Sequence, residues 1–121
     1  MTHFEFNQDT FNRMEMLASD DSFDVLVEMD LTFDLMGIYE VVNGMLKNKD
    51  PRALNLIYLA FHRGMTEWVE KTYSKKELEK KEVEEHVLEI LIEVLHIVTT
   101  FLDIDFQIFD DMSFGLRYHK N

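Results

Sequence analysis

The 121-residue chain contains no cysteine and only one proline. Without cysteine the protein can form neither disulfides nor thiolate sites, which is compatible with action inside a cell. A single proline, together with ten phenylalanines and eight methionines, favours helices with adaptable apolar faces over a turn-rich β fold. The length corresponds to one domain, and the apolar content of 46% is sufficient for a core.

The chain also lacks a long apolar run and an export signal. Its longest apolar stretch, Val94–Leu102, is interrupted by His96, Thr99 and Thr100 and is too short to span a bilayer. The first residues, MTHFEFNQD, have neither the basic region nor the apolar core of a signal peptide. We therefore expect no contact with a membrane.

Basic side chains are scarce, above all at the beginning of the chain. The formal net charge is −12, and residues 1–40 hold ten acids against one base, Arg13. Direct binding of nucleic acid is disfavoured, because no basic patch is available to release counterions from phosphates. Two uses of the acidic surface stay open: binding of a basic protein, which includes mimicry of DNA, and simple solubility.

The predicted fold is mainly α, a small single-domain helical bundle. The clearest pattern predicts a helix that begins at Pro51, because Asp50 is a good N-cap and proline is tolerated at the first helical position. Gly64 suits the end of this helix. Ser74 followed by Glu77 forms a capping box and predicts another helix start. The predicted core consists of residues at helical spacing on the two best-defined helices: Leu54, Ile57, Tyr58, Phe61, Leu88, Leu91, Leu95 and Val98.

The first fifty residues carry weaker signals. A short extended segment is expected at residues 3–6, followed by a short helix that begins near Asp9. A brief helix then precedes a longer helical pattern over residues 33–46. Gly37 and Gly44 each weaken that second helix by about 1 kcal/mol, or else permit close helix packing.

The strongest helical pattern covers Val83–Leu102, where apolar residues spread beyond a stripe about 100° wide. One face should meet the core, and the other needs a second cover from the same chain or from a partner. In the first case the segment is simply the central helix of a small bundle. In the second case the residual face, at Ile90, Val94, Ile97 and Phe101, is the predicted surface for a protein partner or for a homo-oligomer.

The end of the chain differs in composition from the rest. The helical domain is expected to cover residues 1–102, and residues 103–121 are expected to form an acidic and aromatic C-terminal tail. Phe106, Phe109 and Phe114 could make this tail a short docking peptide. A poorly ordered terminus is the alternative.

Signatures of catalysis are missing from the sequence. It contains no nucleophile-elbow, Walker A or dinucleotide glycine pattern, and its five histidines are scattered. Glu93 and His96 have the E-x-x-H spacing of di-iron helical bundles, but such sites need a second copy and two further glutamates on facing helices. We therefore predict that the protein is not an enzyme and holds neither a metal nor a cofactor.

The features of the chain follow one another in a characteristic order. They are an apolar segment with a short helix (FEFNQDTFNRMEML), an acidic loop, a helix with a Gly-Ile start (MGIYEVVNGMLK), a turn with an apolar helix (DPRALNLIYLAFHRG), a capped segment (SKKELEKKEVEEH) and a final long helix. This order, over about residues 4–102, resembles the tail assembly chaperones of long-tailed, siphovirus-type bacteriophages, which are small, acidic and mainly helical.

The resemblance implies a non-enzymatic role in virion assembly, in the cytoplasm of the host cell. Chaperones of this family bind the long helical tape-measure protein, help to recruit tail-tube subunits and are absent from the finished virion. The tape-measure protein and the tail-tube protein are therefore the expected partners. The alternative is an acidic, phage-encoded inhibitor that mimics DNA and binds a host nucleic-acid-binding protein, which the acid-rich first third of the chain motivates.

Overall fold

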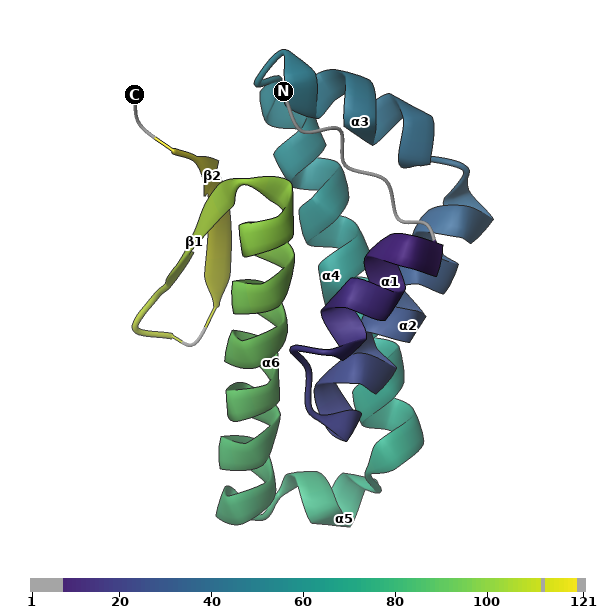
Figure 1. The fold of residues 1–121 in the computed structure, drawn as a ribbon. Helices are drawn as coiled ribbons and strands as arrows, with labels where there is room; N and C mark the ends of the chain where they lie inside the picture. Colours follow the sequence, from purple (N-terminus) through teal and green to yellow (C-terminus); the bar gives the residue numbers. More distant parts are fainter. Residues whose placement is uncertain (1–7, 112, 120–121) are drawn as a thin grey trace.

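The computed structural model describes residues 8–111 and 113–119, which form six helices followed by an antiparallel hairpin (Figure 1). This confirms the prediction of a small, mainly α single domain. The predicted extended segment at residues 3–6 lies outside the described residues. The elements are α1 (Gln8–Glu15), α2 (Asp20–Met36), α3 (Tyr39–Lys47), α4 (Pro51–Thr72), α5 (Lys75–Leu78), α6 (Lys81–Leu102), β1 (Ile104–Ile108) and β2 (Phe114–Tyr118).

The two longest helices, α4 and α6, run in opposite directions through the middle of the molecule (Figure 1). On one side α2 contacts both of them, and on the other side β1 contacts α6 while β2 contacts α4. The short helix α5 turns the chain where α4 ends and α6 begins (Figure 1). The core therefore has α2 on one side of the central pair and the hairpin on the other.

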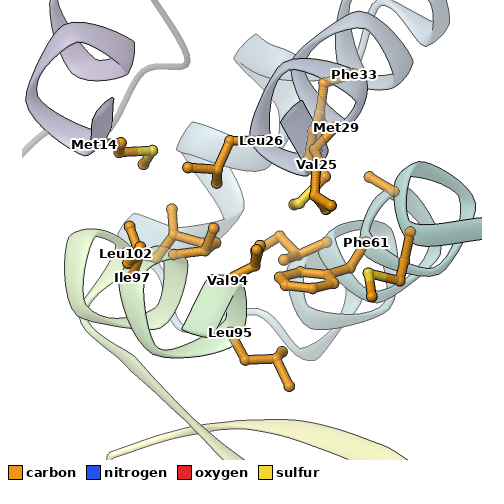
Figure 2. Packing of buried hydrophobic residues seen from close by; sticks show 14 of the residues in the cluster. Met14, Val25, Leu26, Met29, Phe33, Phe61, Val94, Leu95, Ile97 and Leu102 are labelled. Carbon is orange, nitrogen blue, oxygen red and sulfur yellow. The ribbon is translucent and has the colours of Figure 1, made fainter. Parts of the chain in front are cut away.

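The core is built mainly from apolar side chains of α2, α4 and α6, with Met14 of α1 at one edge (Figure 2). Among the eight predicted core residues, Ile57, Phe61, Leu95 and Val98 are fully buried. Leu54, Tyr58 and Leu91 are partly buried against the same cluster, and Leu88 is half-buried. The predicted periodicity thus identified the core face of α4, but only part of the buried face of α6.

Two predicted helix starts are confirmed in atomic detail. The Asp50 carboxylate accepts a hydrogen bond from the backbone N–H of Arg52 at 2.9 Å, and it also accepts from the Arg52 guanidinium. These interactions, the guanidinium first, hold the pKa of Asp50 below its usual range. At Ser74 both halves of the capping box form, with distances of 3.2 Å and 3.0 Å to Glu77. Both caps satisfy N–H groups that a helix start leaves unpaired.

The predicted end at Gly64 is wrong, because α4 continues to Thr72. Gly64 instead lies where α2 crosses α4. A Cβ atom at this position would lie 2.8 Å from Cγ of Met29 and 3.1 Å from its backbone nitrogen. The glycine is therefore required by close helix packing, the role that the sequence had suggested for Gly37 and Gly44.

The helical pattern before Asp50 is divided differently from the prediction. A single helix, α2, extends from its N-cap Ser19 to Met36, and Gly37 ends it in the left-handed conformation at φ 64°. Apart from the adjacent residues and the backbone of the same helix, no described residue has an atom within 4 Å of a Cβ built at Gly37 or Gly44, so neither glycine marks a close helix contact. Gly37 is a helix C-cap, and the chain resumes as α3 after this break.

Most of the predicted C-terminal tail, which was expected to be an acidic and aromatic segment separate from a helical domain over residues 1–102, is folded as a hairpin that packs on the helices. Asp105 and Arg117 pair across the outer face, with 3.0 Å between the guanidinium and the carboxylate. The Tyr118 hydroxyl donates a hydrogen bond to the Asp50 carbonyl at 2.6 Å, which ties β2 to the start of α4. The inner face packs on the core through Ile104, Phe106, Ile108, Phe114, Leu116 and Tyr118.

Candidate protein-binding surfaces

The predicted partner face on α6 is covered by the protein itself. Ile90 and Ile97 are each 4% exposed, and Val94 is completely buried. Met14 and Leu26 lie across from Ile97 (Figure 2). Phe101 is half-buried under the Arg13 guanidinium, whose central carbon lies 5.3 Å from the ring centroid. The prediction that these residues form an uncovered face is therefore wrong, and it no longer gives a reason for self-association.

Polar contacts reinforce this coverage at the start of α2. The Glu93 carboxylate of α6 accepts hydrogen bonds from the backbone N–H of Ser19 at 2.8 Å and from the hydroxyl of buried Ser22 at 2.9 Å. These bonds, chiefly that from the Ser19 N–H, lower the pKa of Glu93. Nearby, the His86 imidazole lies 2.8 Å from the Asp21 carboxylate. Glu93 thus positions α6 against the N-terminus of α2, where a negative charge is favourable.

This contact gives Glu93 a structural role, which differs from the metal-ligand role that its E-x-x-H spacing would suggest. His96, its E-x-x-H partner, is exposed on α6. Within residues 8–111 and 113–119, no three His, Cys, Asp or Glu side chains are grouped so that they could hold a metal ion. The absence of a functional metal stays a prediction.

The surface of α2 that faces away from the core carries three exposed apolar side chains. Val27, Leu31 and Leu35 are 37%, 48% and 85% exposed, respectively. They follow one another at intervals of four residues, so they lie along one side of the helix. The opposite side of the same helix holds fully buried residues such as Val25 and Met29. We call Val27, Leu31 and Leu35 the outer ridge of α2.

The acids of α2 fall into two groups. Three have partners within the protein. Asp21 contacts His86, Glu28 accepts from Lys71 at 2.6 Å, and the Asp30 carboxylate accepts from the Tyr39 hydroxyl. The other three, Asp20, Asp24 and Asp34, are exposed and form no ion pair with any residue that the structure describes. We call these three the outer acids of α2. The helix itself contains no lysine or arginine.

A second apolar surface lies beyond the tip of the hairpin. The Phe114 ring packs on Tyr58 and Phe61, with centroid distances of 4.7 Å and 5.5 Å. Next to Phe114, residues of α4, α5, α6 and the hairpin tip line an open groove of about 590 Å³. Its lining includes Tyr58, Met65, Val69, Leu78, Leu91 and Phe114.

Comparison with known proteins does not assign the chain to a family. No family model, no curated protein and no solved structure matches it. Among the described residues, no helix is both long enough and apolar enough to cross a membrane.

The sequence did contain a signal for the outer ridge. Apolar residues occur on both sides of α2, with Leu31 and Leu35 outside the stripe formed by Val25, Met29 and Phe33. The prediction treated this region as a brief helix, so the second stripe was not recognised. A helix with apolar residues on two sides needs either a second cover in the fold or a partner.

Proposed function

We propose that the protein is a non-enzymatic tail assembly chaperone of a long-tailed bacteriophage. In this role it binds the tape-measure protein in the host cytoplasm, keeps apolar helices of that partner soluble and helps to recruit tail-tube subunits. It leaves before the virion is complete. The proposal rests on the order of features in the sequence and on one structural observation, the outer ridge of α2.

The outer ridge supports protein binding because the fold does not use it. The core is closed by α2, α4, α6 and the hairpin, and Val27, Leu31 and Leu35 lie outside it. An amphipathic helix of a partner can bury such a ridge along its own apolar stripe. The net charge of −12 would keep the resulting complex soluble.

A DNA-mimicking inhibitor is the second candidate, and the outer acids of α2 favour it. Asp20, Asp24 and Asp34 present negative charge on the same side of one helix. The interleaved Leu31 and Leu35 favour the chaperone, because apolar side chains are of no use in imitating a phosphate backbone. Binding of a mimic to a basic host protein should weaken steeply with salt, whereas binding of apolar helices should depend on salt only weakly.

The test is co-expression with fragments of the tape-measure protein from the same phage genome. The wild-type chain should increase the soluble fraction of these fragments, and the double variant Leu31→Ser/Leu35→Ser should abolish the gain. Ile92→Ser is the matched control, because Ile92 is an exposed apolar residue on another helix. Circular dichroism should show that all three proteins are folded. Fragments that stay insoluble with the wild-type chain would contradict the proposal.

A further inference from the structure

We infer that the outer surface of α2 selects a basic amphipathic helix, with lysine or arginine beside its apolar stripe. The inference deepens the proposed function by naming the chemistry of the partner segment. It depends on the combination of the outer ridge with the outer acids on one face of a single helix.

The outer ridge and the outer acids form one continuous stripe. Positions 20, 24, 27, 31 and 34 follow the alternating spacing of four and three residues that is typical of the seam of a coiled coil, and Leu35 lies beside this line, one turn after Leu31. At 1.5 Å per residue the stripe is about 22 Å long, which matches a partner helix of about four turns. Val27, Leu31 and Leu35 supply the apolar contact, Asp20 and Asp24 lie toward the beginning of α2, and Asp34 lies near its end.

Charge complementarity decides which kind of helix fits. The outer acids are exposed, have no ionic partner among the described residues, and belong to a helix without a basic residue. A partner with lysine or arginine beside its apolar stripe would compensate these charges, and an acidic partner would be repelled. A second copy of this chain is disfavoured for the same reason, because two such helices would bring acids together without a base between them.

The inference can be tested with two synthetic peptides of about sixteen residues that share one leucine stripe. One peptide carries lysines beside the stripe, and the other carries glutamates at the same positions. Their affinities for the 121-residue protein are measured by fluorescence anisotropy at low and at high salt. Changes in backbone amide chemical shifts identify the helix that each peptide contacts. Both peptides are examined by circular dichroism for comparable helicity.

The lysine peptide should bind about tenfold more tightly than the glutamate peptide at low salt, because it gains a few exposed ion pairs and avoids repulsion. High salt should reduce this preference. The variant Asp20→Asn/Asp24→Asn/Asp34→Asn should lose the preference but retain binding. The variant Leu31→Ser/Leu35→Ser should lose binding of both peptides, and Ile92→Ser should behave like the wild type.

Equal affinities for the two peptides, no binding of the lysine peptide, or shifts that map away from α2 would each overturn the inference. A wild-type dimer that Leu31→Ser/Leu35→Ser dissociates would also overturn it, because the occupant would then be a second copy. The proposed function can fail separately. If tape-measure fragments stay insoluble while the lysine peptide binds α2, the chaperone role is contradicted and the charge-selective surface on α2 is supported. If the fragments become soluble but the protein binds the lysine and glutamate peptides equally well, the chaperone role is supported and the charge selectivity of α2 is contradicted.

Discussion

Helices α6 and α2 both have apolar residues on more than one side, but these residues are mostly buried in α6 and partly exposed in α2. Each carries more apolar residues than a single core stripe requires. In α6 most of the surplus is covered, since Ile90, Val94 and Ile97 are buried and the hairpin packs on another side of the same helix, although Ile92 is 40% exposed. In α2 the surplus is exposed at Leu31 and Leu35. The apolar content of a helix therefore does not reveal which of its faces is available to a partner.

The difference follows from the position of each helix in the fold. Because α6 is central, it contacts α2, α5 and β1, which approach it from different directions. The main contacts of α2 are with α4 and α6, and both lie on its inner side. On its outer side Leu31 and Leu35 stay exposed. The surplus apolar residues of α6 are thus mostly buried by neighbours on more than one side, whereas those on the outer side of α2 stay exposed.

The largest expected effect tests whether the predicted α6 face is core. Ile97→Asp should lower the free energy of unfolding by about 4 kcal/mol or more, because it places an unpaired carboxylate among buried apolar side chains. Ile92→Asp, on the exposed side of the same helix, should change it by less than about 0.5 kcal/mol. Urea denaturation measures both values. A small effect of Ile97→Asp would mean that this face of α6 is exposed, and it would contradict the difference in burial between α6 and α2.

The next effect concerns the inner side of α2, where it crosses α4. Gly64→Ala should destabilise the protein by about 1–3 kcal/mol, because the new methyl group meets the Met29 side chain and backbone. Gly44→Ala provides the matched control on α3, where a Cβ has open space. That substitution should stabilise the protein by about 0.5–1 kcal/mol through helix propensity. Thermal unfolding of both variants gives the signs, and equal signs would contradict the close approach of α2 and α4.

The smallest effect concerns the hydrogen bonds that hold α6 to the start of α2. The pKa of Glu93 is lowered in the folded protein, so its contribution to stability is present above the usual carboxyl range and is lost as the pH falls through the folded value. Glu93→Gln should therefore cost about 1 kcal/mol near neutral pH, and this cost should shrink as the pH falls through the folded pKa of Glu93. Urea denaturation at several pH values measures this difference. Glu89→Gln, at an exposed position of the same helix, should change the free energy of unfolding by less than about 0.5 kcal/mol at neutral pH. A cost at Glu93 that does not vary with pH would exclude the charged contact.

Several local features of the fold were predictable because their determinants lie within a few residues. Asp50 caps the helix that Pro51 begins, and Ser74 and Glu77 cap each other across three residues. The hairpin was also encoded locally. Ile104–Ile108 and Phe114–Tyr118 both alternate apolar and polar residues, the period of a half-buried strand, although the prediction treated this region as a tail.

The sequence by itself determined the helix starts at Asp50 and Ser74, the helical class and the absence of disulfides, since these depend on neighbouring residues and on composition. Only the tertiary structure decided that Gly64 is a crossing point, that Glu93 holds Ser19, and that Ile97 is covered while Leu31 is not. Each of these outcomes depends on a contact between residues that lie far apart in the chain. Such contacts are set by the packing of whole helices, because every helix buries the face that meets its neighbours and exposes the face that meets none.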